Sequence, residues 1–135
     1  MDITTLKTKL VAVLERFPEI QAAYLFGSVA EGRASTGSDL DLALVPNDAS
    51  AHDRRLDILA ALGAVGLDRV DLVFLDVDDL VLRFEAVRPN VLIFARGDFD
   101  HGDYFSRTLR EYFDFESILA VQREAYKRRL VRGQD

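Results

Sequence analysis

Cysteine is absent from this sequence of 135 residues. Its absence excludes disulfide bonds, thiolate metal sites and a cysteine nucleophile. Long apolar runs are absent too, because no stretch approaches the ~20 residues that a membrane-spanning helix requires. The first residues have the spacing of an amphipathic helix and lack the basic-then-apolar order of a signal peptide. We therefore expect a cytoplasmic chain that does not associate with membranes.

Positive charge is in short supply. The chain carries 17 Lys and Arg against 23 Asp and Glu, which gives a formal net charge of −6 at pH 7. Tight binding to nucleic acid without sequence preference depends on many Lys and Arg contacts to phosphates, so we expect no stable nucleic-acid binding by the chain alone. The length suits one compact domain, and no internal repeat or low-complexity linker divides it. We expect a single domain over residues 1–135.

Apolar residues recur with both helical and strand periodicities along the chain. Helical spacing predicts helices over residues 3–17, 52–65, 78–87 and 101–132. Short apolar runs predict strands over residues 20–26, 40–45, 70–75 and 91–95. The first two strands are too close in sequence for a parallel crossover through a helix, which takes a dozen or more residues. The pattern predicts an α+β fold, with a small mixed β-sheet flanked by helices and a long C-terminal helix.

Three aspartates stand at the edges of predicted strands. Asp39 and Asp41 are two residues apart at the start of one strand, so their side chains should project from the same face of the sheet. Asp71 opens the next strand and reaches the same place if the two strands are neighbours. Carboxylates this close repel one another and lose hydration unless cations neutralise them. Three convergent carboxylates are typical of two-metal phosphoryl chemistry, so we expect a pair of divalent ions here.

A glycine and a serine follow the first predicted strand. Gly27 lets the backbone approach a ligand closely, and exposed N–H groups in the turn that follows can hold phosphate oxygens. The hydroxyl of Ser28 adds a further donor. Together with the three aspartates, this turn predicts a site for a nucleoside triphosphate, held between backbone amides and metal-bearing carboxylates.

These residues carry a family resemblance. Gly27-Ser28, ten further residues and then Asp39-Leu40-Asp41 resemble the signature of the polymerase-β-type nucleotidyltransferase superfamily, and in particular its minimal nucleotidyltransferase (MNT) branch. The resemblance implies the nucleotidyltransferase fold, with Gly27 and Ser28 binding the triphosphate. It implies that Asp39 and Asp41 bind metal. It also implies that Asp71 is the third metal-binding carboxylate and helps to activate the acceptor hydroxyl.

The MNT branch often supplies the antitoxin of a two-gene toxin–antitoxin pair. Such an antitoxin transfers AMP from ATP to a tyrosine hydroxyl of a HEPN ribonuclease toxin, in what is called a type VII pair. The resemblance therefore implies a nucleotidyltransferase with two Mg²⁺ ions, ATP as its NTP substrate, and a small helical HEPN-type toxin as its partner. We expect contact with this partner, or with further copies of the chain, through the sheet edge or the long C-terminal helix.

Glu31 departs from the pattern of the branch. Many members carry arginine before the second glycine of this loop, where this chain has an acid. An acid beside a triphosphate is unfavourable, so either Glu31 points away and Arg33 substitutes, or the site is weaker. Two alternatives to a protein adenylyltransferase stay open. One is a binding-only antitoxin or regulatory subunit; the other is a nucleotidyltransferase acting on a small molecule or an RNA end.

Overall fold

A four-stranded sheet with the order β3-β2-β1-β4 forms the centre of the molecule. The structure, a computed structural model, describes residues 2–33, 39–75 and 79–133. β1 (Ile20–Phe26) lies between β2 (Leu40–Pro46) and β4 (Val91–Ala95) and pairs antiparallel with both. β3 (Val70–Phe74) pairs with β2 in parallel. The mixed sheet that the sequence predicted is confirmed.

The two parallel strands are joined by a helical crossover, as parallel neighbours require. η1 (Ala49–Arg54), a 3₁₀ helix, and α3 (Arg55–Ala64) carry the chain from the end of β2 to the start of β3. The helix predicted over residues 52–65 is therefore two segments. Asp48 begins the first of them, because its side chain accepts a hydrogen bond of 2.8 Å from the Ser50 N–H.

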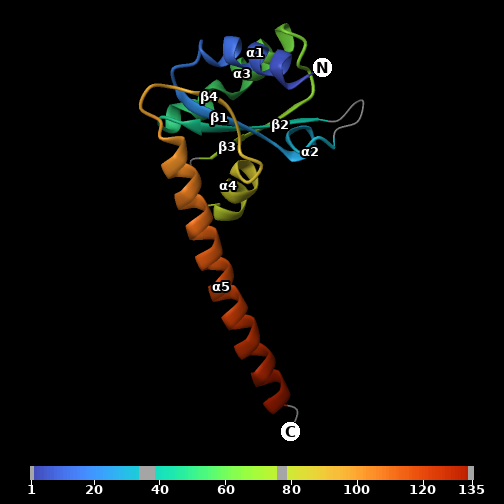
Figure 1. Ribbon diagram of the computed structural model, residues 1–135, viewed down its shortest axis with the longest axis vertical. Coiled ribbons are helices and arrows are strands. Elements are labelled where there is room, and N and C mark those ends of the chain that lie inside the picture. The colour runs from blue at the N-terminus through green and yellow to red at the C-terminus, as the bar shows by residue number, and fades with distance from the viewer. Residues whose placement is uncertain (1, 34–38, 76–78, 134–135) are drawn as a thin grey trace.

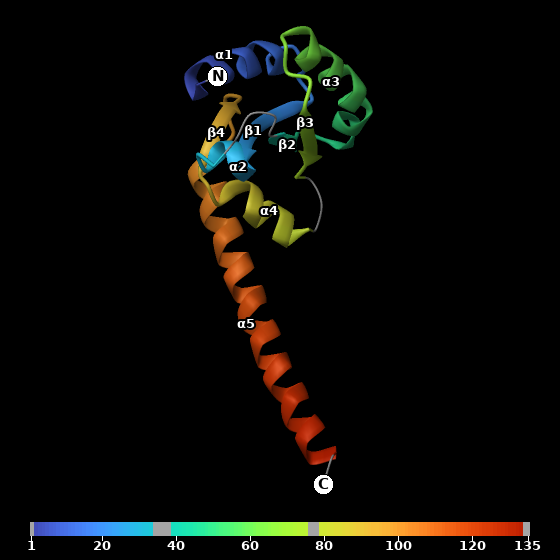
Figure 2. The same cartoon turned by 90° about the vertical axis from the view of Figure 1, so that its right-hand side faces the viewer.

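Helices cover both faces of the sheet (Figures 1 and 2). α1 (Ile3–Leu14) and α3 lie on one face. α4 (Leu80–Val87) and the first part of α5 (His101–Gly133) lie on the other. Residue 78, where the sequence predicted α4 to begin, lies outside the described residues. Within the described part of the chain, no helix is both long and apolar enough to cross a membrane.

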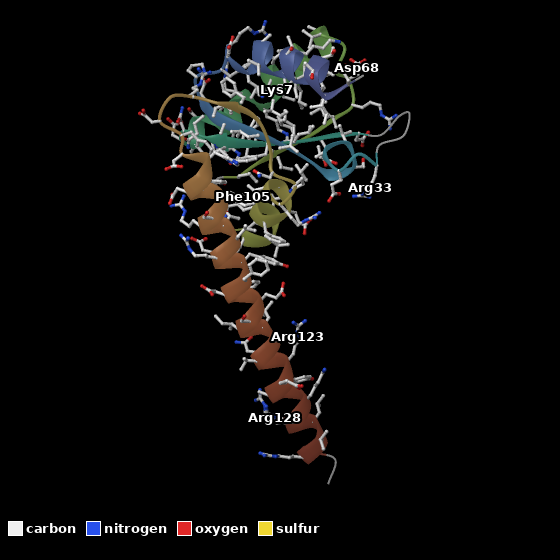
Figure 3. The ribbon with its side chains drawn as sticks, in the orientation of Figure 1. Lys7, Arg33, Asp68, Phe105, Arg123 and Arg128 are labelled. Atoms are coloured by element: carbon white, nitrogen blue, oxygen red, sulfur yellow. The ribbon has the colours of Figure 1, made fainter. Side chains whose placement is uncertain are left out.

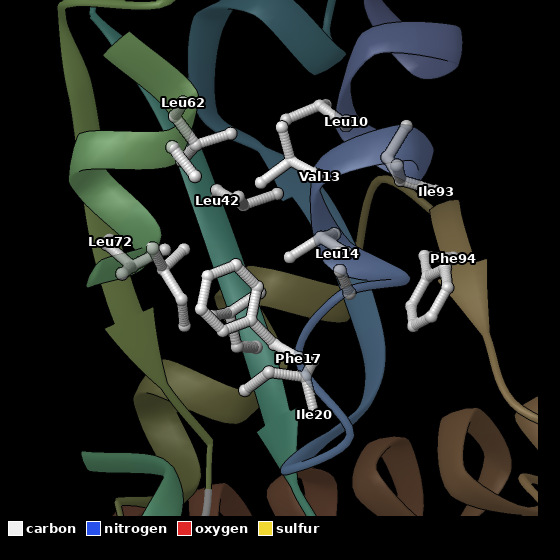
Figure 4. Close-up of a cluster of buried hydrophobic side chains, with 14 of the residues drawn as sticks. Leu10, Val13, Leu14, Phe17, Ile20, Leu42, Leu62, Leu72, Ile93 and Phe94 are labelled. Atoms are coloured by element: carbon white, nitrogen blue, oxygen red, sulfur yellow. The ribbon is translucent and has the colours of Figure 1, made fainter. Parts of the chain in front are cut away.

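The side chains of β2 alternate between these two layers. Leu40, Leu42 and Leu44 belong to the larger core cluster, which lies between the sheet and the helices α1 and α3 (Figure 4). Ala43 and Val45 belong to the smaller cluster on the α4–α5 face. Because side chains alternate along a strand, Asp41 projects to the same face as these last two residues. The alternation places the acidic side chain of β2 on the side of α4 and α5.

Arg96 holds the end of α1 against the sheet from the residue after β4. Its guanidinium donates to four backbone carbonyl oxygens, those of Leu14, Glu15, Phe17 and Ile20, at 2.8–3.1 Å. The last carbonyls of a helix have no partner within the helix, and a cation at this end is favourable. α1 accordingly ends at Leu14, three residues before the predicted end, while Phe17 stays buried in the turn that follows.

We expect Arg96→Leu to lower the free energy of unfolding by about 2–3 kcal/mol, because several partly buried carbonyls lose a charged donor. Arg96→Lys should cost less, since an ammonium keeps the charge and reaches fewer of the four acceptors. Urea unfolding followed by circular dichroism measures both changes. Arg110→Leu, on the exposed surface of α5, serves as the control. Equal stabilities of the Arg96 and Arg110 variants would contradict this role.

α5 is a single helix of 33 residues, which corresponds to about 50 Å, and only its first part contacts the domain. Tyr104 and Thr108 are buried there, and Tyr112 stacks on Phe84 of α4 with ring centroids 3.8 Å apart. Phe113 still meets Phe84 edge to face with ring centroids 5.8 Å apart, and beyond it the helix projects away from the sheet and its helices (Figure 1). The predicted long C-terminal helix is confirmed, and it is unbroken.

Candidate active site

The turn after β1 lies directly against the side chain of Asp41. Gly27 begins α2 (Gly27–Ala30) with φ +70°, and Phe26 pairs with Asp41 across the two antiparallel strands. A Cβ atom at Gly27 would overlap the Asp41 carboxylate and lie 2.9 Å from its Cγ. Glycine is therefore required at position 27 for two reasons: the backbone has a left-handed φ, and the Asp41 carboxylate occupies the space of a Cβ atom.

The first backbone N–H groups of α2 are available to a ligand. The side chain of the N-cap residue, Phe26, makes no capping hydrogen bond, and the first N–H groups of any helix lack a partner within it. Ser28 follows Gly27 and is half-buried, and its carbonyl accepts a 2.8 Å hydrogen bond from the Arg33 N–H. The sequence predicted a turn here, and the structure has one helical turn in its place. The Gly27 backbone lies directly against Asp41, as the sequence analysis expected, and Ser28 is the next residue of α2.

Asp41 and Asp71 are direct neighbours on parallel strands. The register of β2 and β3 pairs these two residues, so both side chains project to the same face of the sheet. Burial raises the pKa of Asp41 above its ordinary value, and the charges of Asp71 and Asp39, together with a side-chain hydrogen bond to Asp71, raise it further. Two carboxylates that disfavour each other's charge form a place where a cation would bind favourably.

Asp39 lies just before β2 and is more exposed. Its Oδ1 accepts a hydrogen bond of 3.1 Å from the Arg69 Nε, and its side chain is 59% exposed. The two groups come from the ends of neighbouring strands, because Arg69 immediately precedes β3. Asp39 is near enough to Asp41 to affect its pKa, but its nearest charge is a cation of this chain. The three predicted aspartates therefore gather at one edge of the sheet, with Asp39 at its rim.

Glu31 is neutralised by two arginines. It forms a very short ion pair with Arg33 and a second, of 2.6 Å, with Arg88 at the end of α4. These partners lower the pKa of the Glu31 carboxyl, the hydrogen bond from Arg33 contributing most. Figure 3 shows Arg33 near α2. The acid that departs from the MNT pattern thus stands between two cations, and Arg88 is a residue near the site that the sequence analysis did not identify.

Comparison with known families decides the assignment. Residues 8–99, more than half of the chain, match the family described as Polymerase beta, Nucleotidyltransferase. The chain belongs to the polymerase beta nucleotidyltransferase family. The match includes β1, the Gly27 turn, β2, β3 and all three aspartates. A search of curated proteins gave no match.

Solved structures share this nucleotidyltransferase fold. A chain in the crystal structure of a toxin–antitoxin complex with AMP-PNP aligns with a TM-score of 0.72 and 24% identity, covering 88% of this chain and 97% of that chain. A chain in the structure of the tri-AMPylated Shewanella oneidensis HEPN toxin with its MNT antitoxin aligns with a TM-score of 0.68 and 22% identity, covering 90% and 97%. At these identities the likeness concerns the fold.

A nucleotidyltransferase of this fold implies a divalent ion, and the donor set fits one in part. Asp41 and Asp71 supply adjacent carboxylate oxygens on a face where their charges are uncompensated, which suits Mg²⁺. Asp39 would have to turn from Arg69 to join them. Among the described residues, no three Asp, Glu or His side chains are already arranged as an ion site. The residues suit ions that arrive with a phosphate ligand better than a preformed cage.

We expect Gly27→Ala to destabilise the protein by about 2–3 kcal/mol, since it adds an overlap with Asp41 to the strain of a left-handed alanine. Gly32→Ala is the matched control, because Gly32 also has a left-handed φ of +71° and no atom lies within 4 Å of its would-be Cβ. It should cost about 1 kcal/mol. Chemical denaturation measures both, and adding Asp41→Ala should recover part of the loss at position 27 only.

We expect Asp41→Asn to raise the melting temperature of the metal-free protein at pH 7 by about 2 °C. The folded-state pKa of Asp41 is raised, so its ionised form destabilises the folded state above that pKa, and the effect disappears below the ordinary value of 3.8. The gain should therefore vanish when melting is measured near pH 3. Asp98→Asn, at an exposed acid away from the site, is the control. A stability gain that persists at low pH would contradict an electrostatic cause.

Proposed function

We propose that this chain is a Mg²⁺-dependent protein adenylyltransferase, which transfers AMP from ATP to a tyrosine hydroxyl of a HEPN-type toxin and so acts as its antitoxin. The observation that carries the proposal is the junction of the Gly27 turn with the Asp41–Asp71 pair. It brings uncapped backbone amides and paired carboxylates to one place, which is what a metal-bound triphosphate needs.

The residues divide the reaction between them. The amides of the Gly27–Ser28 turn and the Ser28 hydroxyl hold the triphosphate. Asp39, Asp41 and Asp71 would hold two Mg²⁺ ions, which would neutralise the phosphate charge and lower the pKa of the acceptor hydroxyl. The tyrosine oxygen attacks the α-phosphorus of ATP. The bond between the α-phosphorus and the oxygen that links it to the β-phosphorus breaks, and pyrophosphate leaves. Asp71, at the exposed edge of the pair, accepts the proton of the tyrosine hydroxyl.

Two solved structures of similar fold support the proposed donor, ATP, and the proposed acceptor, a HEPN-type toxin. One was crystallised with AMP-PNP, an analogue of ATP, in a toxin–antitoxin complex. In the other, the HEPN toxin bound to an MNT antitoxin carries AMP. The similar fold supports proposing the same donor and a HEPN-type acceptor for this chain.

Glu31 favours the binding-only alternative, in which the chain inhibits its partner without turnover. The ion pairs with Arg33 and Arg88 weigh against that alternative, because they offset the negative charge of Glu31. In this proposal Arg33, which pairs with Glu31, substitutes for the missing arginine of the MNT branch. The weaker site that an unpaired acid would cause is therefore not required by this structure.

We expect the chain to transfer label from [α-³²P]ATP, but none from [γ-³²P]ATP, to a co-expressed HEPN-type partner when Mg²⁺ is present. Mass spectrometry should find one AMP on tyrosine for each transfer. Asp41→Asn should reduce the rate by about 100-fold or more, because a charge needed in the transition state is lost. Asp98→Asn, an equal change at an exposed site, should keep the wild-type rate.

The same assay separates the alternatives. Tight binding of the partner without any transfer of label would favour the binding-only antitoxin, provided that no transfer occurs with other labelled NTPs or with Mn²⁺ in place of Mg²⁺. Label on a small molecule or an RNA end instead of on protein would replace the acceptor and keep the reaction. Full activity of Asp41→Asn would overturn the site itself.

A further inference from the structure

The projecting half of α5 exposes many large apolar side chains. They are Phe113, Phe115, Ile118, Leu119, Val121, Tyr126, Leu130 and Val131, each more than a third exposed. Apolar surface of this extent on a protein marks a site of interaction. A helical segment of about 20 residues is also only marginally stable in water without a packing surface. Figures 1 and 2 show this half of the helix standing clear of the rest of the chain in both views.

Part of this surface forms one regular stripe. Phe115, Leu119, Gln122 and Tyr126 follow one another at steps of four, three and four residues, which is the spacing of a coiled-coil seam. The same spacing leads back through Tyr112 and Thr108. Those two positions pack on the domain, Tyr112 against Phe84 of α4. The stripe thus continues the packing face of α5, and it becomes uncovered where α4 ends.

Charge is divided along the helix. From Glu111 onward the acids Glu111, Asp114 and Glu116 come first, and the bases Arg123, Lys127, Arg128, Arg129 and Arg132 follow, with Glu124 as the one acid among them. Figure 3 shows Arg123 and Arg128 on the projecting half. An acidic half followed by a basic half is complementary to itself when a second copy runs in the opposite direction.

We propose that the projecting half of α5 pairs with the same segment of a second copy of this chain as an antiparallel helix pair. In the register that keeps the seam closed, Phe115 packs against Tyr126 of the second copy and Leu119 packs against its Gln122. Beside the seam, Glu116 faces Arg123 of the second copy, and the two-fold symmetry repeats this pair. On the other flank, Ile118 meets Ala125. The two domains then lie at opposite ends of the pair.

A parallel arrangement of the same helices is disfavoured. It would place Arg129 against Arg129 in the seam and Glu111 against Glu116 on the flank. Like charges in these positions repel. In the antiparallel register the flanks instead hold the oppositely charged pair Glu116–Arg123 and the apolar contact between Ile118 and Ala125. Gln122, the polar residue between the apolar seam positions Leu119 and Tyr126, suits a device that fixes register. The sequence of the helix therefore selects both the occupant and its direction, independently of the proposed adenylyltransfer.

Sedimentation equilibrium of the full chain, from about 1 to 200 µM, tests the proposal. We expect the mass to rise to that of a dimer. Glu116→Lys or Arg123→Glu alone should weaken the dimer about 10-fold or more, because each change puts like charges at both symmetric pairs. Glu116→Lys combined with Arg123→Glu in one chain should restore it, as should mixing the two single variants. Asp114→Lys and Arg128→Glu change the same charges on the outer face of α5 and should have little effect.

Cross-linking then reports direction, which is simple to read because the chain has no cysteine. A mixture of Phe115→Cys and Tyr126→Cys chains should give a mixed disulfide. Phe115→Cys alone should not, because the two sulfurs would be about 16 Å apart along the antiparallel pair. The proposal is overturned if the wild type stays monomeric throughout, if the charge swap fails to restore the dimer, if Phe115→Cys links to itself, or if α5 pairs only with a different protein.

Discussion

The close approach of the Gly27 backbone to the Asp41 carboxylate is the constraint on which the site depends. It follows from the pairing of Phe26 with Asp41, which sets the register of β1 against β2. Because the carboxylate fills the space of a Cβ at position 27, the turn lies as near to the acid as atoms permit. One glycine therefore connects the register of the central strands to the distance between the turn and the carboxylates, which we propose to bind phosphate and metal.

The charges near this junction are compensated unequally. Asp39 has Arg69, and Glu31 has both Arg33 and Arg88. Asp41 and Asp71, by contrast, have each other, and the charge of Asp71 adds to the effect of burial in raising the pKa of Asp41. A fold selected for stability alone would avoid such a pair, and carboxylates kept in this state are characteristic of functional sites. The arginines near the site pair with Asp39 and Glu31, and the central pair of Asp41 and Asp71 is left to bind a ligand.

α5 links the catalytic domain to a surface of another kind. Its first half completes the core beside Tyr24, whose hydroxyl hydrogen-bonds His101 Nδ1 at 2.8 Å, while His101 Nε2 is 2.9 Å from the Asn90 side-chain oxygen. Its second half carries the same apolar stripe outward, and no other described part of the chain covers it. The helix is thus anchored rigidly at one end, so anything that binds the projecting end is held at a defined orientation to the sheet.

The sequence by itself determined what depends on local spacing. Strand and helix positions came from apolar periodicity, and the shared face of Asp39 and Asp41 came from the two-residue repeat of a strand. The family signature at Gly27-Ser28 and Asp39-Leu40-Asp41 also lies within one short stretch of chain. Only the tertiary structure decided that β3 lies beside β2, so that Asp71 meets Asp41, and that Arg88 reaches Glu31 across 57 positions. It likewise decided that Arg96 ends α1, from 82 positions away. Periodicity reports the geometry of neighbouring residues, whereas these contacts exist only once the folded backbone brings distant segments together.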